Sequence, residues 1–247
     1  MGTPRFGRAT TCLGAMLRLR PPGPCLLCRR WQMQAVCTAC MQRWRPTVPR
    51  CARCASPWTP ALPHLPCPHC EDPSPEFDRA ITALDYVPPW QHLIGQFKFG
   101  QWPALGAPLA AMLVQAVQQR PHRVDLVLPV PVSTHRLHER GYNQAWVLAR
   151  RAAKALNLPA RPDVLGRVTQ HARLKDLDLA ERRKAIRGAF ALMPGGAQAV
   201  AGRHVALVDD VLTTGATLDE ASLVLREAGA RGVSVWVLAR TPPPGWR

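Results

Sequence analysis

One stretch of this 247-residue chain constrains its fold more than any other, and it covers residues 204–218. It opens with the apolar run Val-Ala-Leu-Val at 205–208, which is typical of a strand covered on both faces. Asp209 and Asp210 follow directly, at the carboxyl end where open α/β sheets bind their ligands. Small, mostly hydroxylated residues at 213–217 then lead into a helix. The stretch therefore predicts a strand, a loop and a helix of a parallel α/β sheet.

The loop at 213–217 has the composition of a phosphate site, and the two acids before it suit hydroxyl groups. Backbone N–H groups, threonine hydroxyls and the positive end of the following helix all favour a phosphate. Adjacent carboxylates repel each other, so they are costly at a strand end unless they serve a ligand or a metal. The alternative is that an Asp and a Thr only cap the helix, for which one acid would suffice. We favour the first interpretation, which predicts a sugar phosphate as the ligand.

The ten residues Val-Asp-Asp-Val-Leu-Thr-Thr-Gly-Ala-Thr at 208–217 resemble the 5-phosphoribosyl-1-pyrophosphate (PRPP) motif of type I phosphoribosyltransferases. The resemblance implies an α/β fold with a Rossmann-like parallel sheet and flanking helices. It also implies that Asp209 and Asp210 hold the 2′- and 3′-hydroxyls of ribose in a catalytic site. The phosphate-binding residues that it implies are Val211, Thr213, Thr214, Gly215, Ala216 and Thr217.

A second stretch, long and basic, follows a strand that we expect at residues 124–130. It reads Pro-Val-Pro-Val at 129–132 and Glu-Arg-Gly-Tyr-Asn-Gln at 139–144. Its length favours a functional loop over a tight turn. His135 and His138 could ligate a metal, but only one acid lies near them in the sequence. We therefore favour solvated or phosphate-facing histidines.

These segments, in this order, resemble the competence protein F family of phosphoribosyltransferase-like proteins. Members of that family typically show Pro-Val-Pro, Arg-Gly-Phe-Asn-Gln and the PRPP motif, and commonly an N-terminal zinc ribbon. The resemblance covers about residues 25–240. By analogy of fold, it implies that Arg140, Gly141 and Asn143 belong to the loop that holds pyrophosphate.

Residues 161–187 form a basic stretch between these two motifs, with eight basic side chains and four acids. The resemblance implies a hood over the substrate, whereas a solvated amphipathic helix is the alternative. Ala185 stands where the family usually has Asn, which weakens a ligand role at that position.

Eight cysteines in four Cys-x-x-Cys pairs define the N-terminal part of the chain. The two intervening residues let both thiolates of a pair converge on one tetrahedral ion. Disulfides would need an oxidising compartment, which no export signal indicates, and a redox site would need a single pair. We predict two structural zinc ions, each held by four thiolates. The ligands are Cys25, Cys28, Cys37, Cys40, Cys51, Cys54, Cys67 and Cys70.

Sequential grouping of these cysteines is the simplest arrangement, with the first four on one ion and the last four on the other. Interleaved grouping stays open, and a short helix at Cys37 and Cys40 could leave one site incomplete. His64 and His69 could substitute as ligands, although complete cysteine sets make that unnecessary. Cys12 has no partner in the sequence, so we expect a free thiol or a small buried residue.

Composition divides the chain into a flexible basic arm at 1–24, a double zinc ribbon at 25–72, a phosphoribosyltransferase-like domain at 77–240 and a Pro-rich tail at 241–247. The formal net charge is +16, and 28 of the 32 basic residues are Arg, which suits bidentate phosphate recognition. If the eight cysteines bind two zinc ions as thiolates, they add −8 and the ions +4, so residues 1–76 carry about +3 and not +7. Most of the basic field therefore belongs to the larger domain.

The chain has no run of about 18 apolar residues, so we expect no membrane insertion and a cytoplasmic location. The resemblance implies attack at ribose C1 of PRPP, departure of pyrophosphate, and Mg²⁺ bridging pyrophosphate and the ribose hydroxyls. The sequence identifies no base for the attacking group and no pocket for an acceptor. That the protein is an enzyme is therefore one of two hypotheses.

The second hypothesis is a non-enzymatic accessory factor that handles single-stranded DNA with the DNA-uptake machinery, its PRPP-type site being regulatory. A basic α/β domain beside zinc ribbons suits that role electrostatically. The stacking candidates in the zinc-binding part are Trp31, Trp44 and Trp58. In so small a module we expect such tryptophans to be core residues.

Overall fold

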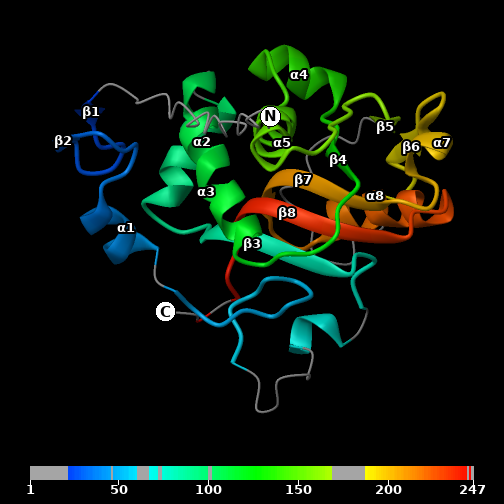
Figure 1. The fold of residues 1–247 in the computed structure, drawn as a ribbon, viewed down its shortest axis with the longest axis horizontal. Helices are drawn as coiled ribbons and strands as arrows, with labels where there is room; N and C mark the ends of the chain where they lie inside the picture. Colours follow the sequence, from blue (N-terminus) through cyan, green and yellow to red (C-terminus); the bar gives the residue numbers. More distant parts are fainter. Residues whose placement is uncertain are drawn as a thin grey trace, which may run out of the picture.

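A parallel sheet with helices on both faces forms the centre of the structure, a computed structural model that describes residues 22–45, 47–59, 67–71, 74–99, 102–168, 187–243 and 245 (Figure 1). The predicted fold class is therefore confirmed. The strands of the sheet are β3 (Arg79–Asp85), β4 (Leu126–Pro129), β7 (His204–Leu212) and β8 (Gly232–Arg240). The long helices are α2 (Trp90–Phe99), α3 (Gly106–Gln118), α5 (Gln144–Leu156) and α8 (Ala216–Glu227).

The order of the strands in the sheet is β3-β8-β7-β4, and every pair is parallel. After β4 the chain passes through α5 and returns outside β4, where Ala160 makes a parallel bridge to Val127. After β7 it passes through α8 and returns on the other side as β8. The connections from β4 and β7 thus diverge, and the point between two such strands is where open α/β sheets bind ligands.

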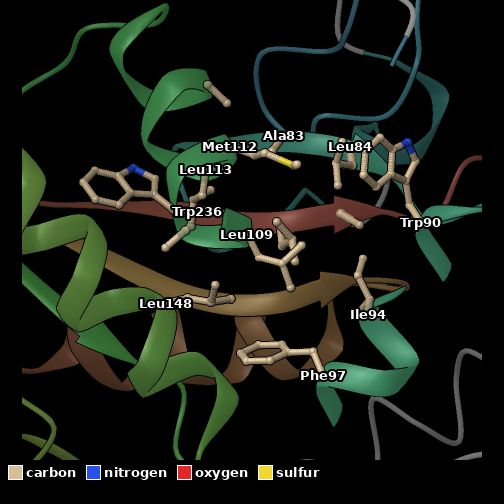
Figure 2. Close-up of a cluster of buried hydrophobic side chains, with 14 of the residues drawn as sticks. Ala83, Leu84, Trp90, Ile94, Phe97, Leu109, Met112, Leu113, Leu148 and Trp236 are labelled. Atoms are coloured by element: carbon tan, nitrogen blue, oxygen red, sulfur yellow. The ribbon is translucent and has the colours of Figure 1, made fainter. Parts of the chain in front are cut away.

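Two apolar layers cover the sheet, one on each face. Helices α2, α3 and α5 pack on one face, where Ile94, Leu109 and Leu148 belong to the same apolar layer as the strand residue Trp236 (Figure 2). Helix α8 packs on the other face against alternate residues of the same strands. In β7, Ala206 and Val208 belong to the first layer, and Val205 and Leu207 to the second. This is the strand buried on both faces that the apolar run predicts.

Strand β7 is longer than predicted, because it continues past the two acids to Leu212. Its partner β8 is also nine residues long, and the pairing runs on through Asp209↔Val237 and Leu212↔Arg240. The backbone hydrogen bonds of the ladder therefore hold both acids in extended conformation. The strand therefore ends four residues after the apolar run, which stops at Val208.

The long loop predicted after β4 contains a helix, α4 (Thr134–Arg140). Ser133 caps it, since its hydroxyl accepts a hydrogen bond of 3.3 Å from the N–H of Arg136. Gly141 ends it with a φ of +76°, a conformation that favours glycine. The short helix lies outside the sheet, above α5 in Figure 1.

Smaller elements complete the described part of the chain. β5 (Leu165–Arg167) and β6 (Phe190–Leu192) pair antiparallel, and residues 169–186, which include most of the predicted hood, lie outside the described residues. Of the helices that the structure describes, none has the length and apolar character needed to cross a membrane. The remaining elements are β1 (Gly23–Pro24), β2 (Trp31–Gln32), α1 (Thr38–Trp44), η1 (Pro68–Cys70), η2 (Pro103–Leu105) and α7 (Gly196–Val200).

Candidate ligand cavity and metal centres

A cavity of about 290 Å³ opens at the carboxyl ends of β4 and β7. Its walls come from the segment after β4, from the acids and loop at the end of β7, and from the end of α2. Two stretches that are some 70 residues apart in the sequence meet there because their strands are neighbours. The predicted residues that line the cavity are Arg140, Asn143, Asp209, Asp210, Val211, Thr213, Thr214, Ala216 and Thr217.

The two predicted glycines do not line the cavity, and each shapes the backbone beside it instead. Gly215 precedes α8 with a φ of +93°, and Gly141 ends α4 with a φ of +76°. A side chain is strained in that region, because its Cβ approaches the backbone. The structure therefore brings these residues to the site as turn formers.

The two adjacent acids have different surroundings. Asp210 is buried and its carboxylate forms an ion pair of 2.9 Å with the ammonium of Lys98. Asp209 is partly exposed and lines the cavity, and its carboxylate accepts a 2.8 Å hydrogen bond from the N–H of Asp210. Desolvation and the neighbouring Asp210 raise the pKa of Asp209 to about 7, against the opposing charge of Lys98. Repulsion between the two carboxylates is thus reduced by pairing one with Lys98 and by favouring the protonated form of the other.

Four basic side chains, those of Lys98, Arg136, Arg140 and Arg167, line the same cavity. The guanidinium of Arg140 lies 4.7 Å from the ring centre of Phe99, and burial lowers the pKa of Arg140. Its Nε is buried and, within the described ranges, has no hydrogen-bond partner. Such an orphaned donor is costly in a closed site, which favours an anion at this position.

Gln144 connects the end of α2 with the turn that carries Arg140. Its amide nitrogen donates to the carbonyl of Lys98 at 3.2 Å, and its amide oxygen accepts from Nη1 of Arg140 at 3.1 Å. The hydroxyl of Tyr142 makes a parallel connection by donating to the carbonyl of Phe97. One buried amide therefore fixes the side chain of Arg140 and the backbone of Lys98.

Asn143 lines the cavity, but both ends of its side chain bind within the protein. Its amide nitrogen donates to the carbonyl of Val130 at 3.1 Å, and its oxygen accepts from the N–H of Trp146 at 3.3 Å. The second contact caps α5. Asn143 thus fixes the distance between the end of β4 and the start of α5.

The loop after β7 presents free backbone donors. The carbonyl of Gly215 accepts from Leu218 and Asp219, both at 2.8 Å, which closes the first turn of α8. Within the described part of the chain, the N–H groups of Thr214, Gly215 and Thr217 meet no acceptor. Free N–H groups at a helix N-terminus are what a phosphate needs.

Sequence reasoning missed Lys98, Gln144 and Tyr86 as cavity residues. Lys98 lies in Phe-Lys-Phe-Gly at 97–100 and is one of only four lysines in the chain. A lone lysine between aromatic residues at a helix end was a usable signal. Its partner Asp210 is 112 positions away, and no local pattern connects the two.

The structure groups the eight cysteines sequentially, so interleaved grouping is wrong. Within each group the four sulfurs lie within 4.8 Å of one another. The Sγ–Sγ distances include 3.7 Å for Cys28–Cys37 and 3.9 Å for Cys51–Cys70. Four sulfurs bound tetrahedrally at about 2.3 Å from one ion would be about 3.8 Å apart. Both groups can therefore hold a metal ion.

A short helix does begin at the third cysteine, yet it leaves the first group complete. Cys37 is the N-cap of α1, and its sulfur accepts from the N–H of Cys40 at 3.4 Å. The sulfur of Cys25 accepts from Leu27 and Cys37, also at 3.4 Å. The helix thus supplies both a ligand and an N–H donor to the thiolates.

Among the residues that the structure describes, no histidine takes part in either four-cysteine group. His135 and His138 lie exposed on α4 and do not line the cavity, so a solvated role fits them. His64 and Cys12 lie outside the described residues.

The fold and the site define a phosphoribosyltransferase-like α/β protein with two N-terminal four-cysteine groups. No family model matches the chain. It is 33% identical over 235 residues to DNA utilization protein YhgH of Escherichia coli (strain K12), covering 90% of this chain and 99% of that protein. It is also 33% identical over 224 residues to Competence protein F of Haemophilus influenzae, covering 87% and 96%. The chain therefore belongs to the competence protein F family.

More distant similarities cover smaller parts of the chain. Competence protein ComFC of Bacillus subtilis is 31% identical over 123 residues, which cover 49% of this chain and 47% of that one. Glutamine PRPP amidotransferase from B. subtilis matches with a TM-score of 0.38 at 23% identity, covering 55% of this chain and 26% of that one. TT1426 from Thermus thermophilus matches with a TM-score of 0.35 at 18% identity, covering 57% and 85%.

Proposed function

We propose that this protein binds PRPP or a related phosphoribosyl compound in the cavity at the ends of β4 and β7. The observation that carries the proposal is the meeting of three groups around one cavity of about 290 Å³. These are the adjacent acids, the loop with free N–H groups, and the four basic side chains. A phosphoribosyl compound has hydroxyls for the first, a phosphate for the second and, in PRPP, a pyrophosphate for the third.

In this proposal Asp209 and Asp210 hold the ribose hydroxyls, and residues 213–217 hold the 5′-phosphate. Arg140, whose Nε has no partner in the described ranges, takes the pyrophosphate. Mg²⁺ bound with PRPP would neutralise part of the pyrophosphate charge. The partly exposed carboxylate of Asp209 suits the oxygen-rich surroundings that Mg²⁺ prefers.

Two candidate functions follow, and they differ in whether ribose C1 is attacked. If this protein is a transferase, an acceptor replaces pyrophosphate at C1, and pyrophosphate is released. If it only binds PRPP, the site regulates another activity. Incubation with PRPP, Mg²⁺ and candidate bases separates the two, because only transfer releases pyrophosphate in an acceptor-dependent way.

Binding itself is tested by thermal unfolding with PRPP and Mg²⁺, which should raise the Tm by several degrees at a hundredfold excess over Kd. The double variant Asp209→Asn with Asp210→Asn should abolish the shift. Asp163→Asn is a matched control, because it removes an exposed acid that pairs with Arg161 away from the cavity. A full shift in the double variant would contradict the proposal.

The names of the relatives connect the family with DNA utilization and competence, which supports a role of this protein in DNA uptake or use. A single-strand-handling accessory factor is the second candidate, and one observation favours it. Trp31 and Trp44 are 71% and 39% exposed, so the expectation that they are core residues is wrong. Exposed indole rings can stack on unpaired bases. Trp58 packs against the second four-cysteine group instead.

We also propose zinc as the ion of both four-cysteine groups, because four thiolates in tetrahedral arrangement are typical structural zinc ligands. Metal analysis of the purified protein should return about two zinc ions per chain. A content near zero in active protein would contradict this. The cytoplasmic location stays a prediction.

A further inference from the structure

A second hollow lies between the first four-cysteine group and the edge of the sheet, and it shares no lining residue with the cavity at the ends of β4 and β7. It is a groove of about 860 Å³. One wall comes from residues 34–50, which include α1, and the other from β3 and α3. Figure 1 shows α1 on the same side of the molecule as α3.

Three arginines line this groove, and no acidic residue does within the described part of the chain. Arg50 is neutralised, since it binds both carboxylate oxygens of Asp85 at 2.8 and 3.0 Å. Arg45 is held by neutral acceptors, the carbonyl of Ala83 at 3.0 Å and the amide oxygen of Gln115 at 2.6 Å. Arg120 forms no ion pair with the described residues. Two positive charges therefore remain without a counter-charge.

The surroundings of Arg45 and Arg120 disfavour the charged form of their guanidinium groups. Burial, and then the charge of Arg50, lower the pKa of Arg45 and of Arg120. Arg45 is partly buried and Arg120 is exposed, so poor screening by solvent applies mainly to Arg45. An anion would relieve this cost, and guanidinium groups bind phosphate oxygens in pairs.

The remaining lining suits more than a lone phosphate. Met41, Pro108 and Met112 contribute apolar surface, and the walls carry four glutamines and three threonines. Apolar and amide groups together match the face and the edges of a nucleobase. The volume also exceeds what an inorganic phosphate needs and lies in the range of drug-sized ligands.

We propose that this groove binds a phosphorylated nucleoside, with its phosphate on Arg45 and Arg120 and its base on the apolar and amide surface. The unit is either a free nucleotide or one residue of a single-stranded nucleic acid, since both present the same chemistry. The site gives the second candidate function a location on this protein. It does not depend on PRPP binding in the other cavity.

The sharpest test changes the charge of the groove without removing an arginine. Gln115→Glu is nearly isosteric and converts the contact with Arg45 into an ion pair, so the fold is kept while the cation is neutralised. Gln118→Glu is the matched control, because it makes the same charge change at an exposed position of the same helix outside the groove lining. Arg120→Gln, with Arg231→Gln as an exposed control outside the groove, provides a second pair.

Binding of a labelled oligo(dT), of dTMP, of inorganic phosphate and of an acidic peptide is measured on the full chain. We expect Gln115→Glu and Arg120→Gln to weaken binding about five- to tenfold, which is about 1–1.4 kcal/mol, with both controls within twofold. Arg120→Gln should also reduce the salt slope of oligonucleotide binding by about one. Tighter binding of the oligonucleotide than of dTMP assigns the groove to a strand, and equal binding assigns it to a free nucleotide.

Three results would overturn the inference. The first is oligonucleotide and dTMP binding that neither groove variant changes. The second is inorganic phosphate binding as tightly as dTMP, and the third is an acidic peptide binding as tightly as the oligonucleotide. The thermal shift with PRPP should persist in all four variants. A missing PRPP shift beside groove-dependent binding would contradict the proposed function and leave the groove intact.

Discussion

The two four-cysteine groups are equivalent in sequence pattern, but the structure connects them to different parts of the molecule. The second group lies against the sheet. Arg240, the last residue of β8, donates to the carbonyl of Cys54 at 3.1 Å and to that of Leu212 at 3.0 Å. One buried guanidinium thus joins this group to the start of the phosphate loop. The first group belongs to the same apolar layer as the strand residue Ile81, and Arg45 beside it donates to the carbonyl of Ala83 at 3.0 Å and lies in the groove.

This difference teaches that the two four-cysteine groups support different sites. The second group stabilises the ligand cavity through Arg240, whereas the first positions one wall of the groove. The cysteines of the second group are all buried, but Cys28 of the first is exposed. Loss of metal should therefore have unequal consequences.

Replacing a cysteine should show the largest effect. Cys67→Ser should lower the free energy of unfolding by more than about 3 kcal/mol, because the second group is buried and its ion contributes to folding. Cys28→Ser should cost less, about 1–2 kcal/mol, since its sulfur is exposed. Urea unfolding and metal analysis of both variants check this. The PRPP shift should be lost in Cys67→Ser and kept in Cys28→Ser, and equal loss in both would break the comparison.

Removing the connecting guanidinium should have the next largest effect. Arg240→Met leaves buried carbonyls without a donor, so we expect a loss of about 2–4 kcal/mol and a weaker PRPP shift. Arg226→Met is the control, because that arginine pairs with Asp78 at the surface and should contribute less than about 1 kcal/mol. Chemical unfolding measures both. Similar losses would show that Arg240 does not connect the two regions.

The smallest effect should be a difference in pH response. The folded protein raises the pKa of Asp209 from 3.8 to about 7, so the favourable contribution of its protonated form is full below about pH 4 and is lost as the pH rises through about 7. Asp209→Asn should therefore stabilise the ligand-free protein at pH 8 by roughly 1 kcal/mol, and by less at pH 5. Thermal unfolding of both proteins at pH 8 and pH 5 measures this stabilisation.

The pH dependence of ligand binding should differ between the cavity and the groove. PRPP binding should change between pH 6 and 8 as Asp209 ionises, whereas oligonucleotide binding should not, because the groove has arginines, glutamines and threonines as its polar residues. A flat PRPP profile would contradict the role of Asp209.

The sequence predicts those parts of the molecule that depend on contacts between residues close together in the chain. The apolar run at 205–208 with its loop and helix specifies one βα unit, and the Cys-x-x-Cys spacing specifies thiolate pairs. The meeting of Arg140 with the acids was also predictable, because the carboxyl ends of parallel strands share one edge. The resemblance to a known family added an expectation of which ligand binds. The boundaries of the domains stay predictions.

What could not be predicted depends on contacts between distant residues. β7 extends to Leu212 because β8 pairs with it. The sequence of one strand does not predict the length of the other. Lys98 and Arg240 bind partners that only the folded sheet brings near. The groove takes Arg45 from the cysteine-rich part and Arg120 from the end of α3, so the charge of either part alone does not indicate it.

The strand order has a consequence for how this protein is made. β3 is the first strand of the sheet to leave the ribosome, and among the described strands it pairs only with β8, the last of the sheet, across about 150 residues of intervening chain. The nascent chain must carry β3 without its partner until residues 232–240 have been synthesised. A product that stops before Gly232 would lack the strand between β3 and β7 and would also lack Arg240. Such a truncated chain would expose β3, β7 and the second cysteine group together, so it would be a ready substrate for proteases and chaperones.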